Sequence, residues 1–415
     1  MNTSTIEACI VGAGPGGVAT ALKLSYLGIP SLLIDKAAFP RDKVCGDAIS
    51  GKVTTLLNRL DPAILERFNA RPIQSDVWGI RFVSPDNKNL NIPFKPNYVR
   101  EATSAPGYVA KRLDFDDFLI GEVKRRANIE FWEGVEVSTY QKQPNGWAVG
   151  TKDGRTIHCR MLIAADGAYS AFSRKQAGLA KDPKHYAAAV RAYYKGVAGL
   201  DKDNFIELHF IKAITPGYFW IFPLPDGQAN VGLGMRSDIM AKRGFNLREE
   251  LDKLLREHPV LSARFSQAEL IGKVKGFGLP LGSKRRSISG DHYMLVGDAG
   301  HLVDPLTGEG IGNAFYSGFI AAEQLQQCIM AEDYSAAFLK AYDKRVDRVL
   351  GSEMRLSYRL QKMLMYPAIV NLIASIIAGN QKVIEVLSGM YNDFSLREQL
   401  ARPAFWLKMF LKKKQ

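Results

Sequence analysis

Three glycines near the start of the chain, Gly12, Gly14 and Gly17, lie between an apolar run and a helical pattern, with G-x-G-x-x-G spacing. In such a unit the first glycine allows a tight turn, the second lets backbone approach a pyrophosphate, and the third allows close helix–strand packing. The helix amino terminus adds free N–H groups and partial positive charge. Asp35 ends the next apolar run and can accept hydrogen bonds from ribose hydroxyls. Together these residues predict a dinucleotide site.

Two later segments bring an acidic residue to the end of an apolar run. One run leads into Asp166-Gly167, and another leads into Gly297-Asp298. A chain that returns twice to one nucleotide indicates a long ligand, and Asp298 can bond the hydroxyls of a ribityl chain. The turn Thr307–Gly312, just before a helical pattern, offers unpaired backbone N–H groups and a helix dipole. A reduced, anionic flavin ring needs such donors, so we predict FAD rather than NAD.

An aromatic stretch, PGYFWIFPLPDGQANVGLG, indicates either a buried core strand or a binding surface for an apolar molecule. In a strand, Tyr218, Trp220 and Phe222 project from one face while Phe219 and Ile221 project from the other. One of these faces must cover a core. The other is either more core or the wall of a pocket for a large apolar molecule, and the residues alone leave both interpretations open.

The order of the elements predicts how these residues are positioned. Residues 76–100 alternate like strands, residues 187–280 hold more strands around a helix at Leu247–Glu257, and the pattern from Ile311 onward is helical. We therefore predict a mixed α/β (α+β) fold with a Rossmann-like FAD-binding domain and a helical C-terminus. The predicted units are an FAD-binding domain (1–75, 101–186 and 281–345), an inserted, mostly antiparallel substrate-binding sheet (76–100 and 187–280) and a C-terminal helical region (346–415).

Composition excludes several classes of protein. Hydrophobic residues make up 47% of the 415 residues, which supports a sizeable core and argues against global disorder. Four cysteines without a CxxC pair argue against a disulfide framework or a zinc site, and six scattered histidines lead us to predict no metal. The net charge of +13 is spread along the chain without a nucleic-acid motif, so we predict no nucleic-acid partner.

The two ends of the chain bear on its location. The start lacks a basic segment followed by an apolar run, so we expect no signal peptide. The segment 363–378 is short of the roughly 20 apolar residues of a membrane span, and we interpret it as a buried or interfacial helix. The final residues, RPAFWLKMFLKKKQ, combine aromatic and basic side chains that suit an anionic surface. We expect a cytoplasmic protein with peripheral contact to the inner face of the membrane through this tail.

The same residues resemble a known family. The glycine turn, Asp166-Gly167 and Gly297-Asp298 are similar to the group 2 flavoprotein fold of p-hydroxybenzoate hydroxylase. RDKVCGD (Arg41–Asp47) and YFWIFP (Tyr218–Pro223) resemble the Cys-Gly-Asp segment and the YxWxFP strand of the geranylgeranyl reductase family. Related flavin-dependent halogenases carry a WxWxIP box, which this chain does not match. The resemblance covers about residues 5–350.

Two further segments refine the resemblance. KRLDFDDFL (Lys111–Leu119) resembles an R-x-x-F-D segment, which implies that Arg112 lies beside the phosphate–ribityl chain of the flavin. The hydroxylases usually carry an arginine seven residues after the aspartate of the Asp-Gly motif. Here Ser173 holds that position and Arg174 follows it, so the chain departs from the pattern at this point.

The resemblance implies an FAD-dependent oxidoreductase that reduces C=C bonds of an isoprenoid, such as a prenyl lipid, a quinone side chain or a prenyl diphosphate. Its YxWxFP strand lines the substrate cavity, so Tyr218, Trp220 and Phe222 are the expected substrate-binding residues. Cys45 and Tyr218 are candidate proton donors, and Trp220 is a candidate catalytic wall residue. The expected FAD contacts are Gly12, Gly14, Gly17, Asp35, Lys36, Cys45, Gly46, Arg112, Asp166, Gly167, Asp298, Gly310, Ile311 and Gly312.

Other reactions stay open at this point. The same scaffold can serve an FAD-dependent aromatic monooxygenase or a halogenase-like enzyme, and prenyl chemistry can run in the oxidative direction. No second GxGxxG marks a nicotinamide domain, so the electron donor is either NAD(P)H or a reduced carrier. The non-enzymatic alternative is a flavoprotein that keeps FAD only as a structural group, or a lipid-binding protein. The sequence does not determine the oligomeric state.

Overall fold

An eight-stranded sheet carries the glycine turn. The computed structural model describes residues 5–95, 97–100, 104–378, 380, 383–385 and 388. In it, β1 (Ile6–Val11) pairs in parallel with β2 (Ser31–Asp35) and β11 (Thr156–Ala164), and their apolar runs are buried, as expected of a parallel sheet covered on both faces. The other strands of this sheet are β8 (Ile129–Glu133), β9 (Val137–Gln143), β10 (Gly146–Thr151), β17 (Ser289–Gly290) and β18 (Tyr293–Leu295).

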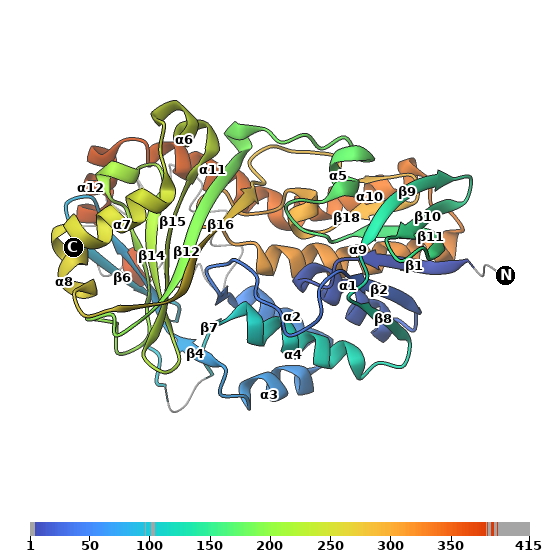
Figure 1. The fold of residues 1–415 in the computed structure, drawn as a ribbon, viewed down its shortest axis with the longest axis horizontal. Helices are drawn as coiled ribbons and strands as arrows, with labels where there is room; N and C mark the ends of the chain where they lie inside the picture. Colours follow the sequence, from blue (N-terminus) through green and yellow to red (C-terminus); the bar gives the residue numbers. More distant parts are fainter. Residues whose placement is uncertain are drawn as a thin grey trace, which may run out of the picture.

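Helices cover this sheet on the right of Figure 1. The turn after β1 leads into α1 (Pro15–Tyr26), which begins with a proline at its first position and packs against α9 (Ile311–Ala331). The helix α4 (Arg112–Lys124) packs beside α1. The remaining helices of this part are α2 (Gly51–Leu60), α3 (Pro62–Asn69), α5 (Ala171–Lys175), α10 (Ala336–Val346) and the 3₁₀ turn η3 (Gly297–Gly300).

A seven-stranded sheet forms the left part of the molecule in Figure 1. All its pairs are antiparallel except β5 with β13. In spatial order its strands are β16 (Glu269–Pro280), β12 (Tyr186–Lys195), β15 (Gln228–Arg236), β14 (Tyr218–Leu224), β13 (Ile206–His209), β5 (Gly79–Val83) and β6 (Asn89–Pro93). The short helices with this sheet are α6 (Ser237–Arg243), α7 (Leu247–Glu257), α8 (Pro259–Phe265), η1 (Pro183–His185) and η2 (Lys212–Ile214).

A small third sheet lies between the two larger ones in Figure 1. It consists of β3 (Ala48–Ile49), β7 (Gly107–Ala110) and β4 (Gln74–Val77), and both β4 and β7 contact β14. This sheet therefore connects the segment after Cys45 to the aromatic strand.

The C-terminal part of the described chain is helical. A π-helical turn, η4 (Asp347–Gly351), joins α10 to α11 (Ser352–Met363), and α12 (Pro367–Ala378) follows after a sharp bend. Among the described residues, no single helix is long and apolar enough to cross a membrane. The helical segments 336–363 and 367–378 reach the length and composition of a membrane span only when they are taken together, and they are bent by 115° relative to each other. The basic and aromatic tail at 402–415 lies outside the described residues.

The predicted fold class, a Rossmann-like FAD-binding fold with an inserted antiparallel sheet and a helical C-terminal part, is confirmed. The helix predicted at Leu247–Glu257 is α7. The helices α6 and α8 and the three-stranded sheet were not predicted. Their segments are short, and a helix of about two turns is stabilised mainly by its tertiary contacts, which local sequence periodicity does not report.

Candidate functional site

One cavity of about 1030 Å³ is lined by residues of both large sheets. Its walls include nearly all of the sequence-predicted contacts: Gly12, Gly14, Asp35, Lys36, Cys45, Gly46, Arg112, Asp166, Gly167, Asp298, Gly310, Ile311, Tyr218, Trp220 and Phe222. Gly17 and Gly312 are not among its lining residues. The two sets of residues that the sequence assigned to a dinucleotide and to an apolar ligand therefore share one space.

The glycine turn shows why each glycine is needed. A Cβ on Gly12, whose φ is +104°, would lie 2.4 Å from the carbonyl oxygen of Ala165, and a Cβ on Gly17 would lie 1.8 Å from the carbonyl oxygen of Gly12. Gly17 therefore acts by packing behind the turn. At Gly14 a Cβ would meet only the Arg41 guanidinium, at 3.9 Å. Gly14 thus faces open space with a cation at its edge, which fits a pyrophosphate.

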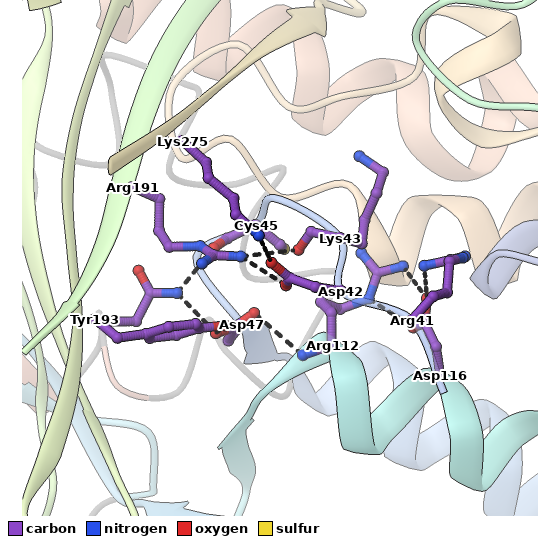
Figure 2. Close-up of polar contacts among 11 residues, drawn as sticks. Arg41, Asp42, Lys43, Cys45, Asp47, Arg112, Asp116, Arg191, Tyr193 and Lys275 are labelled. Atoms are coloured by element: carbon purple, nitrogen blue, oxygen red, sulfur yellow. Dashed lines mark hydrogen bonds and ion pairs between the residues drawn. The ribbon is translucent and has the colours of Figure 1, made fainter. Parts of the chain in front are cut away.

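Arg41 was not predicted as a contact, although it lies in a motif that we singled out. Its Nη1 donates to Asp116 Oδ2 at 2.8 Å, and Arg112 donates to the same carboxylate at 2.6 and 2.7 Å. Two guanidinium groups therefore share one buried carboxylate (Figure 2). The Gly14 contact places Arg41 beside the glycine turn. One positive charge remains uncompensated within this trio, so it suits an anionic phosphate.

Acidic groups line the path that a dinucleotide would follow. Asp35 accepts backbone N–H groups of Ala13 at 2.7 Å and Ala37 at 2.8 Å, which hold its carboxylate at the end of β2. Burial raises the pKa of Asp166 and of Asp298, and Asp166 Oδ1 has no hydrogen-bond partner. Buried acceptors of this kind call for donors such as sugar and ribityl hydroxyls. Together with the space at Gly14, these residues fit FAD.

The turn before α9 closes one end of the cavity. Gly310 and Ile311 line it, whereas the N–H of Gly312 donates to Glu309 Oε1 at 2.7 Å. Gly310 and Ile311 therefore lie where the predicted FAD would meet this turn, whereas the Gly312 N–H is already engaged by Glu309. Burial raises the pKa of Glu309. Nearby, Lys52 Nζ contacts Glu353 of α11 at 2.9 Å, which brings the C-terminal helices to this end of the cavity.

The strand β14 uses its two faces differently. Phe219 and Ile221 are fully buried in a core with residues of α7 and α8, including Phe265. Trp220 and Phe222 belong to a separate apolar cluster and line the cavity. Apolar side chains of neighbouring strands extend this wall: Ile80, Phe82, Ile92, Phe94, Ile206 and Leu208. One aromatic face is therefore core, and the other is the apolar half of the cavity.

Tyr218 ties the aromatic strand to the α9 turn. Its hydroxyl donates to the carbonyl oxygen of Thr307 at 2.5 Å, and burial raises its pKa above the ordinary value. Because the phenolic proton is engaged by a carbonyl, this geometry favours an anchoring contact over proton donation. Tyr218 remains a wall residue of the cavity.

The Cys45-Gly46-Asp47 segment lies against the aromatic wall. Figure 2 shows it at the centre of a polar network. A Cβ on Gly46 would lie 3.0 Å from the Phe222 ring, so the loop approaches that ring closely. Cys45 lines the cavity, and burial raises the pKa of its thiol, so the sulfur keeps its proton near neutral pH.

Asp47 is fully buried and has a φ of +67°. It accepts hydrogen bonds from the Tyr193 hydroxyl and from Asn230 Nδ2, both at 2.8 Å. Burial raises its pKa to about 6, although these two hydrogen bonds partly offset the effect. Neither Tyr193 nor Asn230 was predicted, because nothing in their local sequence marks them.

A second set of contacts joins the same loop to the antiparallel sheet. Asp42 accepts from Arg191 Nη2 at 2.8 Å and from Lys275 Nζ at 2.6 Å (Figure 2). The two cations come from neighbouring strands, β12 and β16. Within the described residues, no group of three or more His, Cys, Asp or Glu side chains is arranged to hold a metal ion.

Comparison with known families places this geometry in context. A model of the FAD binding domain matches residues 5–229, and a model of the geranylgeranyl reductase catalytic domain matches residues 186–277. The second match contains the aromatic strand and most of the antiparallel sheet.

Individual relatives match over most of their length. A digeranylgeranylglycerophospholipid reductase of Thermoplasma acidophilum is 31% identical over 349 residues, which cover 82% of this chain and 83% of that protein. A menaquinone reductase of Mycolicibacterium smegmatis is 31% identical over 373 residues, covering 87% of this chain and 85% of that protein.

Solved structures share the fold. A geranylgeranyl bacteriochlorophyll reductase-like protein of Thermoplasma acidophilum superposes with a TM-score of 0.79 at 24% identity, over 96% of this chain and 98% of that one. A flavin-dependent brominase variant superposes with a TM-score of 0.74 at 22% identity, over 98% of this chain and 100% of that one. At these identities the likeness concerns the fold alone, which reductases and halogenases have in common.

Proposed function

This chain belongs to the geranylgeranyl reductase family of FAD-dependent oxidoreductases, and we propose that it reduces carbon–carbon double bonds of an isoprenoid chain. The observation that carries the proposal is the shared cavity, in which the predicted FAD contacts and the aromatic face of β14 line one space. A prenyl lipid, a quinone side chain and a prenyl diphosphate are the substrates that we consider. The relatives named above are a digeranylgeranylglycerophospholipid reductase and a menaquinone reductase.

The cavity residues bind and align the alkene. FAD, when bound and reduced, supplies the hydride. Trp220 and Phe222 offer flat apolar surfaces that remove the isoprenoid from water. An isolated alkene accepts hydride poorly, so close alignment in a dry space is the main contribution of the protein. Tyr218 keeps this wall in register with the α9 turn through its bond to Thr307.

We propose Cys45 as the proton donor. One alkene carbon receives the hydride and the other receives the thiol proton, and the thiolate regains a proton from solvent. The raised pKa of Cys45 supports this assignment, since the thiol stays protonated until the neighbouring carbon becomes basic. Cys45→Ser should retain FAD and lose most of the turnover. Full activity in Cys45→Ala would contradict the assignment.

An aromatic monooxygenase or halogenase-like activity is the alternative, since a brominase shares the fold. The two functions differ in their need for oxygen. If the proposal is right, reduced enzyme kept without oxygen will be re-oxidised when a geranylgeranyl lipid is added, as measured by flavin absorbance. Trp220→Ala should slow this re-oxidation while FAD remains bound. If the flavin is re-oxidised only when oxygen is admitted, even after lipid has been added, the result would favour the alternative.

The division of the chain into units belongs to the same proposal. We propose that 1–75, 101–186 and 281–345 bind FAD, that 76–100 and 187–280 bind substrate, and that 346–415 form a C-terminal helical region. The strands of the seven-stranded sheet come from 79–93 and 186–280, which supports this assignment. The electron donor, NAD(P)H or a reduced carrier, can be identified by stopped-flow reduction of the bound FAD.

We also propose contact with an anionic membrane surface through the C-terminal part. Supporting it, α12 exposes Ile369, Leu372 and Ile376 to solvent, by 38%, 61% and 40%. The basic tail follows this helix in the sequence. Flotation with vesicles containing an anionic lipid tests the contact. Wild-type protein should float with the vesicles and Leu372→Glu should not, whereas equal recovery of the two would contradict it.

A further inference from the structure

We infer that Asn230 is a positioning residue for the reduction, holding the Cys45 segment against the aromatic wall of the cavity. The inference rests on the proposed function for its catalytic consequence. The underlying geometry stands by itself and can be tested without substrate. It links the two motifs of the family resemblance, RDKVCGD and YFWIFP, through a residue that belongs to neither.

The side chain of Asn230 is fully buried on β15, where it pairs in register with Phe222 of β14. Its Oδ1 accepts the indole N–H of Trp220 at 2.9 Å. Its Nδ2 donates to the carbonyl oxygen of Cys45 and to Asp47 Oδ2, both at 2.8 Å. The Asn230 amide therefore bonds Trp220 of the aromatic wall through its oxygen, and it bonds Cys45 and Asp47 of the loop through its nitrogen.

Two glycines make this arrangement possible. A Cβ on Gly232, also on β15, would lie 2.4 Å from Trp220 Cζ2, so the indole crosses this strand only because residue 232 has no side chain. Gly46 allows the loop to rest on the Phe222 ring, since a Cβ there would lie 3.0 Å from that ring. A glycine therefore permits close packing on each of the two surfaces that Asn230 connects, Gly232 on the wall and Gly46 on the loop.

Asp47 extends the connection to the FAD side. Besides Asn230 and Tyr193, it accepts the backbone N–H of Arg112 at 3.3 Å, and its own carbonyl oxygen accepts from Ala110 at 3.0 Å. A non-glycine residue with positive φ costs about 1–2 kcal/mol, so this turn persists only while such contacts hold it. Loss of Asn230 removes the contact at the Cys45 carbonyl and one of the contacts at Asp47.

Only an amide satisfies both sides at once. Leucine at 230 would leave the indole N–H, the Cys45 carbonyl and one Asp47 contact without their partner. Aspartate would offer an acceptor to Trp220 but would face the Asp47 carboxylate with a like charge and no donor. Neither variant can fix the backbone of Cys45, so we expect its thiol to move relative to the cavity wall.

The test uses the FAD-loaded full chain and the alkylation rate of Cys45 by iodoacetamide. The other three cysteines of the chain are buried, so Cys45 is the expected site of labelling. In Asn230→Leu and Asn230→Asp the rate should change by about tenfold, with FAD retained. In Val231→Ala, which thins the opposite core of the same strand, it should stay at the wild-type rate while thermal stability falls.

Turnover gives the second readout. The Asn230 variants should lose about tenfold to a hundredfold in kcat with a smaller change in KM, as expected for misalignment of a reacting group. Unchanged alkylation in both folded variants would overturn the inference. So would loss of folding in both while Val231→Ala folds, since Asn230 would then be purely structural. Altered alkylation in a protein that reduces no isoprenoid would uphold the positioning and refute the proposed function.

Discussion

The buried carboxylates of Glu207 and Asp47 both bond to residues of the seven-stranded sheet or its helices, but the partners of Glu207 are basic and those of Asp47 are neutral. Glu207 on β13 accepts from Arg264 at 2.6 and 2.9 Å and lies 2.8 Å from a ring nitrogen of His209. Asp47 has neutral side-chain donors instead, Tyr193 and Asn230. Burial alone would raise the pKa of both. The partners of Glu207 lower its pKa to about 2, whereas that of Asp47 stays raised at about 6.

The difference follows the position of each group. Arg264 belongs to α8, so the Glu207 cluster fastens a helix to the sheet and compensates its charge locally. Asp47 lies beside the cavity, where neutral donors fix its orientation without a direct ion pair. The Glu207 cluster therefore joins a helix to the sheet through charged groups, whereas Asp47 joins the Cys45-Gly46-Asp47 turn to Tyr193 and Asn230 through neutral ones.

The largest expected effect comes from breaking the charged cluster. Arg264→Ala leaves Glu207 as a buried carboxylate without its main partner, and we expect it to lower the free energy of unfolding by about 3–5 kcal/mol. Urea unfolding measures the change, with Arg264→Lys as the milder control. Cys45 alkylation in the folded protein should be unchanged. A shift in that rate would show that the two clusters are not independent.

A second prediction uses pH to separate the two groups. The folded pKa of Asp47 lies above its ordinary 3.8, so its stabilising contribution is complete below pH 4 and is lost as pH rises through about 6. The loss amounts to roughly 3 kcal/mol at most. The folded pKa of Glu207 is lowered instead, so its stabilising contribution is present at neutral pH and is lost only as the pH falls toward 2.

Unfolding in urea between pH 4 and pH 7 therefore isolates Asp47. Relative to Asp47→Asn, the wild-type protein should lose stability as the pH increases across this range. Parallel stability curves for the two proteins would mean that Asp47 titrates at its ordinary pKa and is held differently from our description.

A third prediction concerns the contact between loop and wall. Gly46→Ala places a methyl group 3.0 Å from the Phe222 ring and should displace the loop. We expect FAD to be retained and kcat to fall by about tenfold. Gly121→Ala on α4, where a Cβ meets nothing within 4 Å, is the matched control and should leave kcat unchanged. Equal activity of Gly46→Ala and Gly121→Ala would show that the close contact between Gly46 and the Phe222 ring does not matter for turnover.

The smallest expected effect is that of Tyr193→Phe. It removes one of the two neutral side-chain donors to Asp47 and leaves the Trp220 and Cys45 contacts of Asn230 in place. We expect a loss of about 1 kcal/mol in unfolding free energy. Cys45 alkylation should change less than in Asn230→Leu. The reverse order would assign the positioning to Tyr193 rather than Asn230.

The sequence supports predictions wherever chemistry is local. The turn at Gly12–Gly17 and the alternation of Tyr218–Phe222 depend on short spacings, and the structure shows both as expected. The bond between Asn230 and Asp47 joins residues 183 positions apart, and that between Lys52 and Glu353 spans 301 positions. Such contacts depend on how distant strands, loops and helices come together, which no local pattern encodes.

Isoprenoid reduction is tested most directly by product analysis without oxygen. Chemically reduced, FAD-loaded enzyme is incubated anaerobically with a geranylgeranyl lipid, and the lipid is examined by mass spectrometry. We expect products that gain hydrogens in pairs, and we expect Asn230→Leu to form them at least about tenfold more slowly. A lipid that is unchanged without oxygen, but incorporates oxygen in air, would contradict the central claim of isoprenoid reduction.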